Sequence, residues 1–160
     1  SDEQQTMLGQ AQWKWLEEEL QQKADLRILV SSIQVLAEDH GYECWRNLPR
    51  ERERLLGLLA RSYGAPLILL SGDRHMAALY RKTHEGMPLY ELTSSSLNLG
   101  TGLRPEFHGS PQLSPYFTQP NFGLVQVHWK TERLRLVLYS SEGSWLFTHE
   151  ISLDELERRP

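Results

Sequence analysis

The first part of the chain contains one stretch with helical periodicity and one aliphatic run. Between residues 7 and 22, Trp13, Leu16 and Leu20 recur at helical spacing among polar residues that favour helices, which predicts an amphipathic helix. Residues 26–33 form a short aliphatic run, a pattern typical of a strand that is buried on both faces. We therefore expect a helix followed by a buried strand.

A second helix and a second strand are predicted after a loop over residues 34–49. Pro49 suits the first turn of a helix, because its missing N–H would be unpaired there, and leucines at helical spacing extend the helix over residues 50–63. Gly64 is expected to end this helix, and the apolar residues 65–70 predict a second buried strand. Strand, helix and strand in this order typically join parallel neighbours in one sheet.

The remainder of the chain has the patterns of antiparallel strands. Residues 77–82 and 88–93 flank a glycine-containing turn and predict a hairpin. Residues 95–120 have no periodicity, and a loop of that length is usually functional or mobile. Apolar and polar residues then alternate, which predicts a meander closed by a short helix from Ser152. Its strand-like runs are residues 125–129, 134–138 and 145–151. The predicted fold class is α/β.

Composition supports one folded unit over residues 1–160 and excludes several classes of protein. The apolar fraction is 39% and five tryptophans are present, unlike the composition of disordered chains. The 17 basic and 21 acidic residues give a net charge of −4, which argues against a polybasic nucleic-acid module. The apolar run 65–70 is far shorter than the roughly 20 residues of a membrane span. A lone Cys44 has no partner for an internal disulfide.

The strongest candidate site is Gly72-Asp73-Arg74-His75, directly after the second predicted strand. Functional residues gather at the carboxyl ends of strands in parallel sheets. Gly72 would allow a sharp turn, and Asp73 and His75 offer the oxygen and nitrogen ligands that suit Mn, Fe and Zn. Alternatively, Asp73 caps a turn and His75 is an ordinary surface residue. Both interpretations stay open from the spacing alone.

Other polar residues are expected at the same edge of the sheet, because they follow predicted strands in the sequence. Arg74 offers a planar fork of donors to a phosphate oxygen, or is a solvated charge. His40, after Asp39, is a candidate substrate-binding residue, metal ligand or acid–base group, or a turn residue. Gln34 and Ser95 follow strand ends, where they would bind a ligand or satisfy backbone groups. No Gly-x-Ser-x-Gly elbow, P-loop or Cys-x-x-Cys occurs, so serine hydrolases, nucleotide switches and zinc ribbons lose their main support.

Five blocks of sequence form a more specific pattern than any single motif. They are residues 6–17, 30–36, 49–52, 71–75 and 88–95. In this order they resemble the carboxyl-terminal half of the PhoD-like alkaline phosphatase D family, whose members are metallophosphoesterases. Residues 121–123 and the strands after them also resemble the tail of that family.

The resemblance implies part of a four-layer α/β/β/α sandwich with mixed sheets and a two-metal centre at strand ends. Asp73 and His75 match the family's Gly-Asp-x-His block and would be metal ligands, with Arg74 between them at the catalytic centre. Iron(III) and calcium are the ions that the resemblance suggests, with Mn, Zn and Mg as alternatives. The activity implied is hydrolysis of a phosphate monoester or diester, in which bound ions activate a water and stabilise the leaving oxygen.

The chain departs from the family pattern at several points. Ala78 replaces a frequent acidic residue of the family, so a role for that carboxylate has no support in this chain. Ser96 replaces a family glycine, so a different backbone is expected at that rim. The family's upstream Gly-Asp-x-x-Tyr and Trp-Asp-Asp-His-Asp blocks do not occur. We therefore expect the carboxyl-terminal portion of an enzyme, inactive alone, with the amino-terminal half or a second copy as its partner. The alternative is a non-catalytic binding module with the same sheet. Periplasmic, secreted and cytoplasmic locations all remain open.

Overall fold

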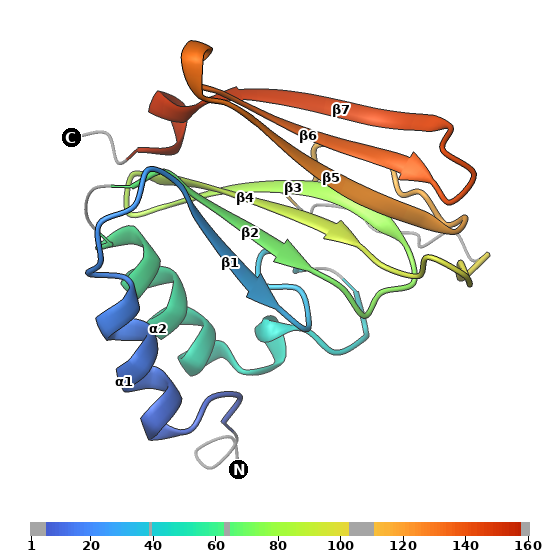
Figure 1. Ribbon diagram of the computed structural model, residues 1–160. Helices are drawn as coiled ribbons and strands as arrows, with labels where there is room; N and C mark the ends of the chain where they lie inside the picture. The colour runs from blue at the N-terminus through green and yellow to red at the C-terminus, as the bar shows by residue number, and fades with distance from the viewer. Residues whose placement is uncertain (1–5, 39, 63–64, 103–110, 158–160) are drawn as a thin grey trace.

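The structure is a computed structural model that describes residues 6–38, 40–62, 65–102 and 111–157. These residues form three layers. Helices α1 (Gln10–Glu19) and α2 (Pro49–Ala60) lie on one face of a mixed sheet, and an antiparallel sheet lies on the other face (Figure 1). The predicted α/β class is confirmed, and these are three of the four layers expected. The strands are β1 (Arg27–Ser31), β2 (Leu67–Ser71), β3 (Ala77–His84), β4 (Met87–Ser94), β5 (Asn121–His128), β6 (Arg133–Ser140) and β7 (Trp145–Ser152).

The mixed sheet has the strand order β1-β2-β4-β3. Strands β1 and β2 are parallel and joined through α2, as predicted, and β4 is parallel to β2. Strands β3 and β4 form the predicted hairpin, in which Glu85 and Gly86 both take positive φ angles of 46° and 80°. Paired positive φ angles match the twist of the two strands, which favours this tight turn.

The second sheet is the predicted antiparallel meander, β5-β6-β7. A short 3₁₀ helix, Leu153–Leu156, follows β7 and buries both terminal leucines. Gly123 of β5 lies where the two sheets approach closely, because a Cβ atom there would stand 3.2 Å from Leu92 and Ser94 of β4. Because glycine has no side chain, Gly123 permits this close packing.

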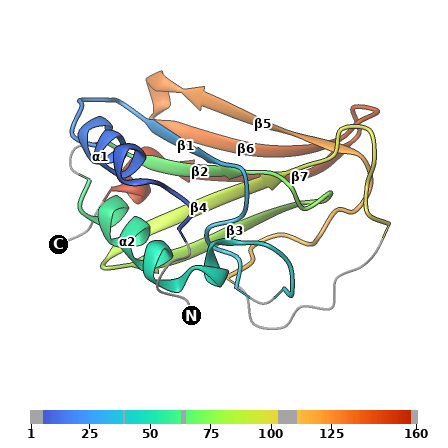
Figure 2. The same cartoon turned by 90° about the horizontal axis from the view of Figure 1, so that it is seen from below.

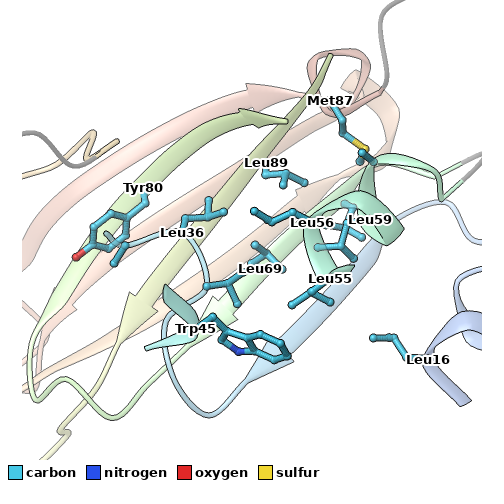
Figure 3. Packing of buried hydrophobic residues seen from close by; sticks show 14 of the residues in the cluster. Leu16, Leu36, Trp45, Leu55, Leu56, Leu59, Leu69, Tyr80, Met87 and Leu89 are labelled. Carbon is cyan, nitrogen blue, oxygen red and sulfur yellow. The ribbon is translucent and has the colours of Figure 1, made fainter. Parts of the chain in front are cut away.

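One hydrophobic core lies between the helices and the mixed sheet (Figure 3). Its labelled members include Leu16 of α1, three leucines of α2, and side chains from β2, β3 and β4. Helix α1 is also held by Glu51 of α2, which accepts a hydrogen bond from the Trp13 indole at 2.8 Å, while Arg54 lies 4.2 Å from the Trp13 ring centroid. The amphipathic pattern of α1 therefore faces α2 and the sheet, as its spacing predicts.

A second core lies between the two sheets. It contains Ile68, Leu79 and Leu92 from the mixed sheet, and Leu136 and Leu138 from the antiparallel sheet. Strand β2 is therefore covered on both faces, which confirms the prediction for this run.

The prediction that the first strand is buried on both faces is wrong. Ile28 and Val30 of β1 are 46% and 72% exposed. Strand β1 is the edge of its sheet, and the antiparallel sheet does not cover it, so an aliphatic run here does not mean two covered faces.

The segment predicted as one long loop is only partly irregular. Residues 111–117 run beside β3, with isolated antiparallel bridges from Gln112 to Tyr80 and from Phe117 to Ala77. Gly64, expected to end α2, lies outside the described residues, and α2 ends at Ala60. Among the described helices, none combines the length and the apolar character that crossing a membrane requires.

Candidate functional site

The carboxyl ends of three parallel strands meet at one edge of the mixed sheet. Ser31 of β1 pairs with Ser71 of β2, and Ser71 pairs with Thr93 of β4. The segments that follow these strands therefore begin side by side (Figure 2). This arrangement is the one predicted for the edge that holds Gln34 and the Gly72–His75 segment.

The turn after β2 has an uncommon backbone. Asp73 and His75 have φ angles of 67° and 53°, in the left-handed region that most residues avoid. The Arg74 N–H donates to the Gly72 carbonyl at 2.9 Å, which closes a three-residue turn centred on Asp73. Turns of this kind with positive φ are rare and strained. The sharp turn expected in this segment is present, and Asp73 and His75, not Gly72, adopt the positive φ angles.

Asp73 and His75 are both exposed, so their carboxylate and imidazole are accessible to a ligand. No group of three or more Asp, Glu, His or Cys side chains with metal-binding geometry exists among the described residues. The turn itself supplies one oxygen and one nitrogen donor, a chemically suitable but partial ligand set for Mn, Fe or Zn. Asp39, adjacent to His40, lies outside the described residues. A complete metal centre would need ligands beyond those described here.

Arg74 joins the turn after β2 to the loop after β1. Its guanidinium lies 4.3 Å from the ring centroid of Tyr42, a cation–π arrangement. Tyr42 in turn lies 6.2 Å from the ring of His40 and donates its backbone N–H to the His40 Nδ1 at 3.3 Å. His40 is buried, whereas Tyr42 is exposed. The structure thus brings together Arg74 and His40, which come from two different strand ends.

Gln34 lies beneath these loops and is completely buried. Its amide nitrogen donates to the Thr93 hydroxyl at 2.8 Å, and this hydroxyl also bonds to that of Ser71 at 2.8 Å. Gln34, which follows β1, is therefore linked through these hydroxyl groups to the carboxyl ends of β4 and β2. Its position fits support of the site, since it has no exposed surface in the described structure with which to touch a ligand.

A buried carboxylate that the sequence analysis did not single out holds the loop after β1. Glu91 of β4 is completely buried and accepts the backbone N–H groups of Val35 and Leu36 at 2.8 Å and 2.7 Å. Arg52 of α2 donates to the carbonyls of the same two residues at 2.7 Å and 3.1 Å. Burial raises the pKa of Glu91 above its ordinary value, although the two N–H groups, Ser71 and Arg52 act in the opposite direction.

Glu38 completes this set of charged side chains at the end of the held segment. It accepts a hydrogen bond from Arg52 at 2.9 Å and another from Lys82 of β3. Burial acts to raise the pKa of Glu38, but its bonds to Lys82 and Arg52 outweigh that effect, so the pKa lies below its ordinary value. The loop that leads to His40 is therefore fixed from the helix side and from the sheet side. The role of Glu91 cannot be predicted from alternation of polar and apolar residues, because Glu91 lies in a strand that is buried at nearly every position.

Ser95 is half-buried and lies beside the same edge. Its N–H donates to the Met76 carbonyl at 3.2 Å, and its own carbonyl accepts from the Asn121 amide at 2.9 Å. The next residue, Ser96, has a φ of 75°, the glycine-like conformation. Ser96 thus has a conformation that glycine adopts without strain.

Replacing Ser96 with glycine is expected to stabilise the chain slightly. Relief of a left-handed conformation gains about 1–2 kcal/mol, and the greater freedom of glycine in the unfolded chain offsets about 0.5–1 kcal/mol of that. The matched control is Ser95→Gly, at a residue without positive φ, which should lower stability. Urea unfolding of both variants measures the difference. A loss of stability in Ser96→Gly equal to that in the control would contradict the expectation.

Ala78 is completely buried in the core under the helices. It pairs with Thr93 across the β3–β4 hairpin. At the position where the resemblance predicts an acidic residue, a small apolar side chain of β3 therefore faces the core between the helices and the mixed sheet.

Comparison with known protein families decides the affiliation of the chain. The model of the PhoD-like phosphatase family matches residues 1–136. The chain belongs to the PhoD-like phosphatase family. Membership supports a phosphatase type of function, and the three strand ends described above occur within the matched residues. None of the curated proteins matches the sequence.

A solved structure gives the same affiliation for the fold. The structure titled "Structure of PhoD" superimposes with a TM-score of 0.71 at 16% sequence identity. The match covers 95% of this chain and 37% of the PhoD chain. The chain therefore has the fold of one part of PhoD and spans well under half of its length.

Proposed function

We propose that this chain is the carboxyl-terminal portion of a PhoD-like phosphatase and forms part of a metal-dependent site that hydrolyses phosphoric esters. The observation that supports this most directly is the exposed, strained Asp73–His75 turn at the carboxyl edge of the parallel strands. Strained backbone at the expected place of a ligand site is typical of functional turns. Family membership provides the chemical context.

The proposed role of Asp73 and His75 is to provide two ligands of a two-metal centre. Iron(III) with calcium is the proposed pair, and Mn, Zn or Mg are the alternatives. The chemistry expected of the bound ions is activation of a water nucleophile and stabilisation of the leaving oxygen. The remaining ligands would come from the rest of the PhoD-like domain, since the described residues form no complete set.

Arg74 is proposed to bind the phosphate group of the substrate. Its stacking on Tyr42 occupies a face of the guanidinium and holds the side chain in one orientation. The N–H donors in the guanidinium plane suit the oxygens of a phosphate, with which arginine forms paired hydrogen bonds. His40 would position Tyr42 through the contact with its backbone, Gln34 would support the strand ends, and Ser95 would line the rim.

Hydrolysis of para-nitrophenyl phosphate and of bis-para-nitrophenyl phosphate tests the proposal. The chain alone is expected to show no turnover, and the chain assembled with the amino-terminal portion of its domain is expected to be active. Chelation should abolish activity, and adding back Fe(III) with calcium, or Mn, should restore it. Normal turnover by the isolated chain, or activity indifferent to chelation, would contradict the proposal.

The alternative is a non-catalytic binding module, favoured by the partial ligand set. Metal titration of the assembled protein distinguishes the two functions. Unchanged metal affinity in Asp73→Asn and His75→Ala would favour the module.

A further inference from the structure

A hollow of about 420 Å³ opens between the two sheets, next to the carboxyl ends of β2 and β4. Its walls come from these two strands, from β5 and from the segment after β4. The apolar side chains among them are Leu70, Leu92, Leu97, Phe122 and Val125. The volume lies within the roughly 300–1,000 Å³ of pockets that hold small organic ligands.

The hollow borders the candidate site through two segments of the chain. Ser71, the last residue of β2, lines the hollow, and Asp73 follows two residues later. Leu97, in the segment after β4, also lines it. The same segment reaches the candidate turn, because the Thr101 N–H donates to the His75 carbonyl at 3.0 Å. A molecule in the hollow would therefore lie beside the turn of the proposed metal ligands.

Polar groups in the walls are bonded within the protein. The Ser94 hydroxyl donates to the side-chain oxygen of Asn121 at 2.8 Å, and the Asn121 amide donates to the Ser95 carbonyl at 2.9 Å. The Ser71 hydroxyl is bonded to that of Thr93 at 2.8 Å. An apolar ligand would leave all of these hydrogen bonds in place, whereas a strongly polar ligand would have to replace them. The walls therefore favour an apolar occupant.

One wall contains an aromatic ring that is held in place. Phe122 stacks on Tyr139 of β6 with 5.3 Å between the ring centroids, and it remains 37% exposed. In the segment after β4, Leu97 and Leu99 are both 63% exposed. Exposed apolar side chains gathered beside a cleft are typical of a ligand-binding groove, and a fixed ring favours packing with another ring.

We infer that this hollow binds the organic group of the phosphate ester, and that the preferred substrates are phosphate esters of aromatic alcohols. The inference rests on the proposed function, because it names the substrate class of that same site. The phosphate would lie at the turn of Asp73 and His75, and the aromatic group would lie against Phe122 and Leu97. Apolar contact of this kind contributes to affinity in proportion to the area that it removes from water.

The first test measures binding without hydrolysis. Naphthol, which has the aromatic group but no phosphate, is titrated into this chain and into the chain assembled with the amino-terminal portion of its domain. We expect saturable binding to both, with shifted amide signals for residues 94–97 and 121–125 in nuclear magnetic resonance spectra. Inorganic phosphate should leave these signals of the isolated chain unchanged.

The deciding variant is Val125→Trp, which fills the hollow from β5. It is expected to weaken naphthol binding at least about tenfold, because the indole would occupy the space that the ligand needs. The matched control is Leu124→Trp, since the neighbouring side chain on a strand points to the opposite face of the sheet. This control should bind naphthol as the wild type does.

A second variant removes part of the wall without filling the hollow. Leu97→Ala should leave folding intact, because this side chain is 63% exposed, and it is expected to weaken naphthol binding at least about fivefold. Leu113→Ala, at another exposed leucine outside the hollow, should leave binding unchanged. Thermal unfolding of each variant checks that the chain is folded.

Steady-state kinetics of the assembled phosphatase then compares naphthyl phosphate with ethyl phosphate. Each variant is compared with the wild type on the same ester, so differences between the leaving groups cancel. Val125→Trp is expected to raise KM for naphthyl phosphate at least about tenfold and to change KM for ethyl phosphate less than about twofold, since only the aromatic ester uses the hollow.

Three outcomes would overturn the inference. They are no naphthol binding to the assembled protein, binding that Val125→Trp leaves intact, and equal increases in KM for the two esters. The first outcome would mean that another part of the domain fills the hollow. Naphthol binding as expected, without hydrolysis of either ester by the assembled protein, would support the aromatic site and contradict the proposed function instead.

Discussion

Replacing Asp73 with asparagine is expected to lower kcat/KM of the assembled phosphatase more than about 100-fold, since even residues behind metal ligands cost 10–100-fold when they are changed. Asparagine is the suitable replacement because, like aspartate, it tolerates the left-handed backbone that position 73 requires. It removes the negative charge while keeping the turn. His75→Ala is expected to have an effect of similar size.

The two substitutions should not be additive if both residues bind the same metal centre. Removal of either ligand would already disable the centre, so the double variant is expected to be nearly as active as each single variant. Metal content, measured on the purified protein, should fall in both. The melting temperature of the isolated chain should change little, because both side chains are exposed.

Matched controls use the same residue types far from the turn. His128→Ala changes an exposed histidine at the end of β5, and Asp154→Asn changes an exposed aspartate after β7. Both controls should retain full activity and metal content. Full activity in Asp73→Asn would rule out a role for this carboxylate in the centre.

Sequence patterns predicted the arrangement of the site better than its local geometry. The order of strand, helix and strand indicates that β1 and β2 are parallel neighbours, and the pairing of Ser31 with Ser71 confirms a shared edge. Topology follows from such patterns because chain connectivity allows few alternatives. The sequence predicted a sharp turn after β2 but not its positive φ angles, which Asp73 and His75 adopt.

Burial of polar residues was not predictable from local pattern. Glu91 occurs in a strand whose other positions are nearly all buried, and its partners come from residues about 55 positions earlier in the chain. A hydrogen bond over that separation depends on the tertiary fold. The exposure of Val30 was missed for the same kind of reason, because an aliphatic run does not reveal which strand lies at an edge.

Replacing Glu91 with alanine is expected to lower the free energy of unfolding by about 3 kcal/mol, since two buried N–H groups would each lose an acceptor at a cost of about 1–3 kcal/mol. Glu91→Gln should cost less, because its amide oxygen still accepts one of the two hydrogen bonds. Urea unfolding at pH 7 measures both changes. Hydrogen exchange at Val35 and Leu36 should accelerate, because these are the residues whose N–H groups Glu91 binds.

The pH dependence of this difference has a definite sign. Burial raises the pKa of Glu91 in the folded chain above its ordinary value of 4.5, so the folded state binds the proton more tightly than the unfolded state does. The contribution of Glu91 to stability is therefore fully present below about pH 4.5 and declines as the pH rises through the folded pKa. The stability of the wild type relative to Glu91→Gln should fall over the same interval.

Comparison with the glutamine variant isolates Glu91 from other carboxylates. The pKa values of Glu38 and Glu51 are lowered, by hydrogen bonds that outweigh burial, so their contributions are lost as the pH falls below 4.5. These contributions are the same in both proteins and cancel in the difference. If the wild type gained stability relative to Glu91→Gln as the pH rose from 4 to 7, the carboxylate would be stabilised in its ionised form, and the two N–H bonds with Arg52 would outweigh burial.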